Sequence, residues 1–520
     1  MFRFVGHRSS EPALILLDSE HRKRTVYTWA DYQTEALRAS NYLHSRGVKK
    51  GDFVAIIALN LPESFFTLLG TMLLGAVPVP INVPLIKERG QADLRAILDD
   101  CRPKLVLANR CLDRYLADIE HVHIEDTLNG DVLGCPKQRW EGGELLIMPY
   151  TSGTTGGPKG VMLSLGAISD RVGAITAELE VSGSERLLSY LSLGHISELV
   201  ATFFGQLHSG YTVYFTEHAK ELIEDREKFR LAFPHILQAA RPTVFLAVPK
   251  VWINIRKEIE KKTRYVPVDL GRYGVIRNLI VRKILDRLGL DQAKRFISAG
   301  SKLSPEDELF FAKLGIYIDD VYGQTETGGP LTINGKVVGE TRLMIGPDDE
   351  ILVNGPNVMQ GYYNNVQATA RVLKDGTYHT GDVGMWQTHL YGLSYPLELD
   401  PEGRVYYGGR LGDSFKLAQG EFVPAEIIET LENEIKRIPG VDEAIVCGDG
   451  KPYLVAIVFS AGPSAGLERD LVLTIPQLGQ GIHRLRGWLV VDSKELEMTP
   501  TLKVRRKAML KKFEKEISKL

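Results

Sequence analysis

The sequence predicts an α/β fold, with a large N-terminal domain of mixed and parallel sheets flanked by helices and a small mobile α+β domain at the C-terminus. At 520 residues the chain is several times longer than a typical domain of ~150 residues. Short apolar runs alternate with longer helical patterns, as in βα units on parallel sheets. From about residue 351 short β-rich segments separated by Gly, Asn and Asp indicate a β-rich subdomain.

Individual strands and helices can be placed from these patterns. The predicted strands are Phe53–Ala58, Leu105–Ala108, Thr243–Val248 and Arg295–Ala299. The predicted helices are Asp31–Arg46, Leu165–Glu180, Pro249–Lys262 and Pro305–Leu314. Ser304 precedes the last helix as an N-cap, and Pro305 with two acidic residues forms its first turn.

The segment from Phe65 to Leu85 carries no charge and is about as long as the ~20 residues that span a bilayer. Three prolines in its second half, Pro78, Pro80 and Pro84, would remove helical hydrogen bonds and favour an extended path. We therefore expect a buried helix over residues 62–75 followed by a buried strand, and no integral membrane span. Peripheral membrane contact is left open.

Composition limits the partners and the compartment. The 63 basic and 65 acidic residues give a formal charge of −2, so the protein has no overall electrostatic field that would attract nucleic acid. Nucleic acid is therefore not expected as a partner. The four cysteines lack the spacings of a zinc or redox motif. The N-terminus lacks the apolar core and cleavage site of a signal peptide, so a cytoplasmic location is predicted, with peripheral membrane association left open.

A domain boundary is predicted in Gly408–Asp413, where three glycines in five residues allow cheap changes of φ and ψ. The expected domains are residues 1–409, with the β-rich subdomain at about 335–409, and residues 410–520 as the mobile C-terminal domain. A helix beginning near Pro424 and strands at Ala444–Cys447 and Tyr453–Phe459 give the second domain an α+β character.

The first chemical motif is the loop Tyr150–Gly160. Its four glycines let successive backbone N–H groups turn toward one point, while hydroxyl groups and Lys159 add donors and positive charge. Pro158 before Lys159 and Gly160 after it distinguish the loop from a Walker A motif. Composition alone would also fit a flexible surface loop, but the ordered spacing favours phosphate binding.

The second motif is Asp320–Thr327, which follows a strand-like run. It places an aromatic face, a tight glycine turn, a hydroxyl and a carboxylate within five residues. A hard cation that bridges phosphate oxygens prefers such oxygen ligands. Taken alone, the same residues would also fit a solvent-exposed turn.

These two motifs resemble the signatures of the adenylate-forming (acyl-activating) superfamily of AMP-binding enzymes, which includes acyl-CoA synthetases, luciferases and peptide-synthetase adenylation domains. Further similar segments occur in the family's order, so the resemblance covers essentially the whole chain. They are Ser298–Ser304, His379–Val383, Gly409–Glu429 and Met498–Arg506. The segment Phe415–Glu421 is particularly similar to long-chain fatty acyl-CoA synthetases.

The resemblance implies a nucleotide site with ATP and Mg²⁺. Tyr322 is expected to stack on adenine, Thr325 to bind the α-phosphate, Asp382 to accept both ribose hydroxyls, and Glu326 with Thr151 to hold Mg²⁺. The full implied nucleotide-binding set is Thr151, Ser152, Gly153, Thr154, Thr155, Gly156, Lys159, Gly300, Ser301, Tyr322, Gly323, Gln324, Thr325, Asp382, Arg410 and Lys503.

The resemblance also implies five catalytic residues. Lys159 and Glu326 act on the phosphates and their metal, and His195 lies beside the carboxylate and gates the acyl tunnel. Lys503 bridges the acyl carboxylate and AMP during adenylation, whereas Lys416 serves the conformation that forms the thioester. A lone histidine on an apolar segment is otherwise more often a core residue.

Two features depart from the family pattern. Gly412 stands where relatives usually have Asp or Lys, which leaves the resting position of the hinge open. Residues 385–407 form a longer connection than is usual between the neighbouring motifs, and we expect this insert to loop outward or to shape a partner contact.

The predicted activity is that of an AMP-forming fatty acid–CoA ligase. A medium- to long-chain fatty acid reacts with ATP to give acyl-AMP and pyrophosphate, and CoA, the cosubstrate, then displaces AMP to form the thioester. One alternative is a fatty acyl-AMP ligase that passes the adenylate to an acyl carrier protein. Another is a non-catalytic nucleotide-binding regulatory protein. Acyl chain length and oligomeric state, including a homodimer, are left open.

Overall fold

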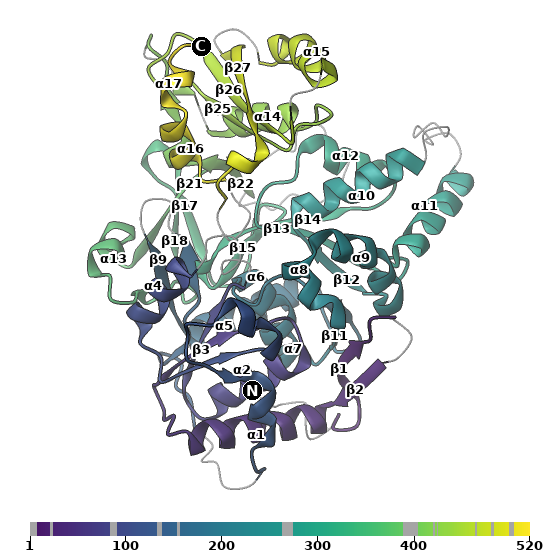
Figure 1. The fold of residues 1–520 in the computed structure, drawn as a ribbon, viewed down its shortest axis with the longest axis vertical. Helices are drawn as coiled ribbons and strands as arrows, with labels where there is room; N and C mark the ends of the chain where they lie inside the picture. The colour runs from purple at the N-terminus through teal and green to yellow at the C-terminus, as the bar shows by residue number, and fades with distance from the viewer. Residues whose placement is uncertain are drawn as a thin grey trace. The chain divides into compact units, whose positions relative to one another are not determined.

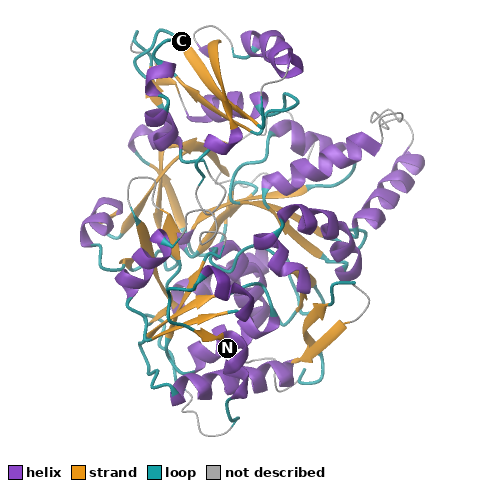
Figure 2. Cartoon of the chain, in the orientation of Figure 1, coloured by secondary structure: helices purple, strands orange, loops and turns teal. Residues whose placement is uncertain are grey.

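The computed structural model describes residues 8–20, 24–83, 91–132, 138–152, 157–262, 274–387, 404–419, 422–423, 425–462, 465–479, 483–498 and 504–520. The chain divides into two compact units (Figure 1). Unit 1 comprises residues 1–342 and 354–376, and unit 2 comprises residues 343–353 and 377–520. Helices and strands are mixed in both units, as Figure 2 shows. The domain boundary expected at residue 410 stays a prediction.

One parallel sheet of unit 1 has the strand order β4-β3-β5-β6. These strands are β4 (Val77–Ile81), β3 (Phe53–Ile57), β5 (Leu105–Ala108) and β6 (Val122–His123). Helix α2 (Pro62–Leu73) is buried along most of its length, packs against α1 (Trp29–Ser45) and leads into β4. The expected buried helix and strand are therefore confirmed. No helix among the described residues is long and apolar enough to cross a membrane.

A second sheet of unit 1 joins parallel and antiparallel strands in the order β12-β13-β14-β15-β16. They are β12 (Val244–Ala247), β13 (Arg295–Ala299), β14 (Ile318–Gln324), β15 (Gly329–Ile333) and β16 (Lys336–Val337). Strands β12, β13 and β14 are parallel, and β15 is antiparallel to both of its neighbours, β14 and β16. Trp252 packs edge-on against Phe245, Phe296 and Phe311 in the core beside this sheet.

Two further sheets lie among the described residues of unit 1. The order β10-β11-β1-β2 joins Arg186–Leu188, Thr212–Thr216, Pro12–Leu17 and Arg24–Thr28. The order β19-β9-β7, with β8 paired to β9, joins Gly361–Tyr362, Pro158–Ser164, Leu145–Ile147 and Tyr150–Ser152. The other α-helices among the described residues of unit 1 are α4 (Ala92–Cys101), α5 (Leu165–Glu178), α6 (Ile196–Glu198), α7 (Gly205–Ser209), α8 (Glu221–Glu224), α9 (Arg226–Ala240), α10 (Pro249–Lys262), α11 (Gly274–Leu288), α12 (Pro305–Lys313) and α13 (Val366–Val372).

Local signals placed the predicted helices well. Helix α10 spans the expected residues, and α12 begins at Pro305 as predicted. The hydroxyl of Ser304 accepts the backbone N–H of Asp307 at 3.2 Å, which confirms the predicted N-cap. The predicted strand at residues 295–299 is β13.

Unit 2 contains a β-sheet near its start and an α+β part near its end. In the sheet, β17 (Arg342–Ile345), β18 (Glu350–Asn354), β21 (Thr377–Gln387) and β22 (Arg404–Arg410) are neighbours in that order. In the α+β part, β25 (Glu443–Cys447) is antiparallel and β27 (Leu485–Asp492) is parallel to β26 (Leu454–Ser460). Its helices are α14 (Ala425–Ile435), α15 (Ala465–Thr474), α16 (Arg506–Lys512) and α17 (Glu514–Ile517).

The predicted insert at residues 385–407 begins and ends in paired strands. Met385 lies opposite Tyr406 and Gln387 opposite Arg404, so β21 and β22 extend into both ends of the insert. The intervening residues 388–403 lie outside the described residues.

Candidate functional site

The predicted phosphate loop connects two strands of a hairpin in unit 1. Strands β8 and β9 are antiparallel, and their register places Thr151 opposite Lys159. A strand follows the loop, whereas a helix follows a Walker A motif. Ser152 is the last residue of β8, and the structure does not describe its side chain. Loop residues Gly153, Thr154, Thr155 and Gly156 also lie outside the described residues.

Lys159 and Glu326 are brought together by a residue that the sequence analysis did not single out. The ammonium nitrogen of Lys159 lies 4.9 Å from the centre of the Tyr362 ring. The hydroxyl of Tyr362 donates a hydrogen bond of 2.9 Å to Oε1 of Glu326. A cation–π contact and a charge-assisted hydrogen bond therefore meet on one side chain, which is buried.

Backbone pairing fixes the position of Tyr362. It belongs to β19, where it lies opposite Val161 of β9. The next residue, Tyr363, donates its backbone N–H to the carbonyl of Gly160 at 2.8 Å. Met359 donates its N–H to the carbonyl of Glu326, also at 2.8 Å. Residues 359–363 therefore hydrogen-bond to both β9 and the segment that carries Glu326.

The predicted adenine and metal motif forms the end of β14 and the 3-10 helix η6 (Thr325–Thr327). A Cβ atom on Gly323 would lie 2.3 Å from the carbonyl oxygen of Gly329, so the backbone approach requires glycine here. The hydroxyl of Thr327 lies 2.9 Å from the carbonyl oxygens of Gln324 and Gly329. These contacts hold the turn, in which Tyr322, Gln324, Thr325 and Glu326 are half-buried.

Gly300 and Ser301 follow the adjacent strand β13 and are exposed. Strands β13 and β14 are parallel, with Ala299 opposite Val321. The residues that follow β13 and the end of β14 therefore lie at the same edge of the sheet, where ligands bind in open α/β sheets. Gly300 has a φ of +95°, a conformation that favours glycine.

Two carboxyl groups near this edge have raised pKa values, and neither was predicted to act in the site. Burial raises the pKa of Asp320 to about 6, although the positive charge of Lys302 opposes this shift. Burial also raises the pKa of Glu308 to about 7, with a further contribution from the charge of Asp320. Such shifts depend on tertiary packing, which the sequence pattern does not contain.

The predicted acyl-site histidine lies next to a buried acid. Nε2 of His195, at the start of α6, is 3.4 Å from the side-chain amide nitrogen of Asn82. Three positions later, Oε1 of Glu198 accepts hydrogen bonds from Ser189 at 2.5 Å, Thr202 at 2.9 Å and Asn60 at 3.1 Å. Burial raises the pKa of Glu198 to about 7, against the effect of these donors.

In unit 2 the predicted ribose ligand Asp382 is paired with Arg410, another residue of the predicted nucleotide-binding set. Asp382 of β21 lies opposite Arg410 of β22. Nε of Arg410 is 2.9 Å from Oδ1 of Asp382, whose side chain is buried, whereas that of Arg410 is 41% exposed. A buried carboxylate is thereby paired with a cation that reaches solvent.

Glu350 orders the turn that precedes Asp382. Its Oε2 lies 2.9 Å from Nδ1 of His379, and its Oε1 accepts the backbone N–H of Gly381 at 2.9 Å. The hydroxyl of Thr380 donates to the carbonyl of Ile351 at 2.7 Å. Glu350 was not predicted from the sequence, because it comes from the neighbouring strand β18.

The predicted hinge contains one position that requires glycine. Gly409 has a φ of +110°, and a Cβ atom there would lie 2.5 Å from Cβ of Ala425. Gly412 is exposed within the 3-10 helix η8 (Leu411–Asp413). Lys416 lies in the short strand β23 (Phe415–Lys416), but the structure does not describe its side chain. Lys503 lies outside the described residues. Hinge rotation and the roles of both lysines stay predictions.

Comparison with known proteins gives consistent matches along the chain. The family model described as AMP-binding enzyme matches residues 2–363, and that described as AMP-binding enzyme C-terminal domain matches residues 416–520. A long-chain-fatty-acid–CoA ligase of Mus musculus is 24% identical, over 98% of this chain and 91% of its own length.

Solved structures show the same fold. The O-succinylbenzoate CoA synthetase of Bacillus subtilis in complex with ATP and magnesium ion has a TM-score of 0.73 at 21% identity, covering 96% of this chain and 97% of its own. The adenylation domain of a carboxylate reductase from Mycobacterium chelonae has a TM-score of 0.78 at 21% identity, covering 99% of this chain and 88% of its own. The predicted α/β fold class is therefore confirmed.

Replacing Glu198 by Gln is expected to change the pH dependence of stability. The native pKa of Glu198, about 7, is raised above its ordinary value of 4.5, so the native state favours the protonated group. Stability contributed by that proton is present below pH 4.5 and is lost as the pH rises to about 7, by up to about 3 kcal/mol. Gln has no titratable group, so the variant lacks this pH-dependent contribution to stability.

Urea unfolding of the wild-type protein and of Glu198→Gln, each at pH 5 and pH 8, measures this difference. We expect the wild-type protein to lose more stability between the two pH values than the variant does. Equal losses in both proteins would show that Glu198 does not carry a raised pKa.

Proposed function

Because the chain belongs to the AMP-binding enzyme family, whose members form adenylates, we propose that it activates a medium- to long-chain fatty acid with ATP and transfers the acyl group to CoA. The observation that carries this proposal is the connection of Lys159 and Glu326 through Tyr362 beside the hairpin of the phosphate loop. The likeness to the murine long-chain-fatty-acid–CoA ligase over 98% of the chain supports a fatty acid as the substrate.

The described residues of unit 1 fit a magnesium–phosphate site. Oε1 of Glu326 accepts from the neutral hydroxyl of Tyr362, and no hydrogen bond to Oε2 is found among the described residues. The Glu326 carboxylate and the Thr151 hydroxyl are oxygen ligands of the kind that Mg²⁺ prefers. When bound, Mg²⁺ neutralises charge on the phosphates of ATP. The related synthetase of Bacillus subtilis in complex with ATP and magnesium ion supports this assignment.

The remaining residues would hold the nucleoside. Tyr322 would offer its ring to adenine, next to Gly323, where no side chain fits. Asp382 would accept the ribose hydroxyls. A carboxylate has about four acceptor positions, so its ion pair with Arg410 is compatible with that contact.

The chemistry needs no nucleophile from the protein. An oxygen of the fatty acid carboxylate attacks the α-phosphorus of ATP, the bond to pyrophosphate breaks, and acyl-AMP forms. Lys159 and Lys503 would stabilise the negative charge that develops on the phosphate oxygens. The thiolate of CoA then attacks the acyl carbonyl carbon, and AMP leaves. The side of the C-terminal domain near Lys416 would serve this second step.

Product analysis with a panel of acids tests the proposal. The protein is incubated with ATP, Mg²⁺, CoA and each acid, from acetate through aromatic acids to very long fatty acids. We expect acyl-CoA, AMP and pyrophosphate in equal amounts, with the highest kcat/KM for medium or long chains. Pyrophosphate release without a thioester would instead indicate transfer to a carrier protein. If no acid supports exchange of pyrophosphate with ATP, the enzymatic proposal is wrong.

Replacing Tyr362 by Phe is expected to lower adenylation without removing the fold. Phe retains the ring beneath Lys159 but loses the hydroxyl that donates to Glu326. A hydrogen bond to a charged group contributes about 1.5 to 3 kcal/mol, so we expect kcat/KM for pyrophosphate exchange to fall by about tenfold or more.

Tyr363→Phe is the matched control, because Tyr363 is the next residue and none of the proposed contacts uses its hydroxyl. It is expected to retain near wild-type exchange. Equal activity of Tyr362→Phe and the wild-type protein would show that the Tyr362 hydroxyl does not position Glu326. A melting temperature for each variant distinguishes this effect from loss of fold.

A further inference from the structure

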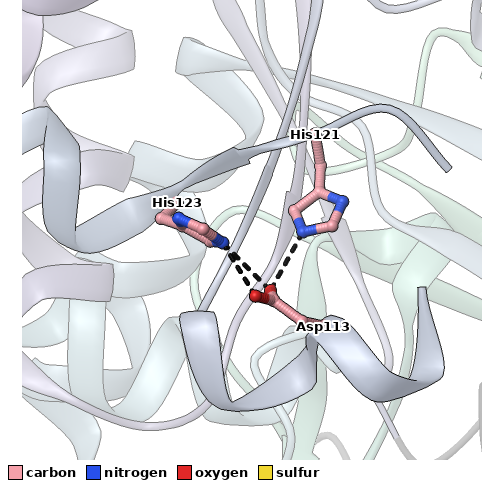
Figure 3. Close-up of side chains that lie close together, drawn as sticks. All are labelled: Asp113, His121 and His123. Atoms are coloured by element: carbon pink, nitrogen blue, oxygen red, sulfur yellow. Dashed lines mark hydrogen bonds and ion pairs between the residues drawn. The ribbon is translucent and has the colours of Figure 1, made fainter. Parts of the chain in front are cut away.

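Three side chains with metal-binding atoms lie close together, as Figure 3 shows. They lie beside β6, the edge strand of the sheet β4-β3-β5-β6. Asp113 comes from the 3-10 helix η1 (Arg110–Tyr115), His123 ends β6, and His121 precedes that strand. Oδ1 of Asp113 is 3.1 Å from Nε2 of His121 and 3.0 Å from Nε2 of His123. One donor atom of each residue lies within 4.8 Å of those of the other two.

The second nitrogen of each ring also faces an oxygen. Nδ1 of His121 is 2.7 Å from the carbonyl oxygen of Ile119, and Nδ1 of His123 is 3.6 Å from Oδ2 of Asp126. A carbonyl oxygen only accepts, so Nδ1 of His121 must carry a proton. In the neutral ring, Nε2 then directs its lone pair at the carboxylate of Asp113. A metal cation bound between Nε2 of His121 and Oδ1 of Asp113 would be coordinated by both atoms.

The arrangement of His121 is typical of metal-binding histidines, whereas the 3.6 Å contact of His123 with Asp126 is longer than a hydrogen bond. Metal-binding histidines coordinate through one ring nitrogen and donate the other N–H to a carbonyl or carboxylate, which fixes the ring. The separations also suit coordination. Ligands ~2.0 to 2.1 Å from a tetrahedral zinc ion lie roughly 3.3 Å apart, close to the 3.0 and 3.1 Å found between Asp113 and the two rings.

We propose that Asp113, His121 and His123 bind a divalent transition-metal ion, with Zn²⁺ as the reference ion. Two imidazoles and one carboxylate favour zinc, nickel, cobalt or copper over Mg²⁺ and Ca²⁺, which prefer oxygen ligands. The Asp113 side chain is 48% exposed, so the ion is reached from solvent and water completes its coordination. None of these residues belongs to the proposed nucleotide site, and the inference does not rest on the proposed function.

The bound ion ties η1 to β6. Strand β6 is short and pairs with β5 through Leu107 opposite Val122 and Ala108 opposite His123. Metal bonds add a cross-link between this short strand and the preceding 3-10 helix. A protein that binds the ion only when folded gains stability in proportion to the logarithm of the free metal concentration.

Calorimetric titration of the untagged, nucleotide-free protein tests the site. The protein is stripped with EDTA, returned to buffer with excess MgCl₂ to occupy oxygen-rich sites, and titrated with ZnCl₂. We expect one Zn²⁺ per chain and an affinity at least about tenfold weaker in His121→Gln and in His123→Gln. His44→Gln, at an exposed histidine in another part of unit 1, and Cys111→Ser, at an exposed thiol of η1, are expected to bind as the wild type does.

Two further measurements distinguish loss of the metal site from misfolding of a variant. Zn²⁺ is expected to raise the melting temperature of the wild-type protein and of His44→Gln but not that of His123→Gln. Co²⁺ bound to the wild-type protein is expected to give a visible absorption band that stoichiometric Zn²⁺ removes. Absence of Zn²⁺ binding by the wild type, or equal binding by the wild type and both histidine variants, overturns the proposal and leaves the cluster as an ion-pair network.

Discussion

A single tyrosine ring, contacted by a lysine and hydrogen-bonded to a carboxylate, connects the elements on which the proposed site depends. Lys159 belongs to β9 and Glu326 to η6, and Tyr362 reaches both because β19 pairs with β9. The cationic and anionic groups are thus held before a nucleotide binds. Groups fixed in this way stabilise developing charge without the cost of reorganisation during the reaction, which is the basis of electrostatic catalysis.

The sequence predicted those parts of the fold and site that depend on local signals. The apolar period and the Ser304 cap located α10 and α12, and the spacing of the glycines located the loop that contains Lys159, although not the hairpin to which it belongs. Tyr362 and Glu350 were missed because their roles come from pairing between distant strands. A tyrosine in an apolar segment has the same local pattern whether it fills a core or orients a carboxylate.

Buried acids illustrate the same limit in energetic terms. Glu198 and Asp320 have raised pKa values because tertiary packing removes them from water, and neither burial follows from the neighbouring residues in sequence. The histidine pair at residues 121 and 123 was also missed, because its carboxylate, Asp113, lies on the preceding 3-10 helix and only the fold brings the three side chains together. Sequence motifs therefore identify the chemistry, whereas the three-dimensional structure identifies the groups that orient it and set its charge.

The central claim, that Tyr362 acts by holding Glu326, is tested most directly by a double-mutant cycle on carboxylate-dependent pyrophosphate exchange. Tyr362→Phe is measured in the wild-type protein and in the Glu326→Ala background, in which no side-chain acceptor remains. If the two residues act through their hydrogen bond, Tyr362→Phe has little further effect once Glu326 is replaced, with a coupling energy of about 1 to 2 kcal/mol. If Tyr362→Phe lowers kcat/KM by the same factor in both backgrounds, the two residues act independently and the account is wrong.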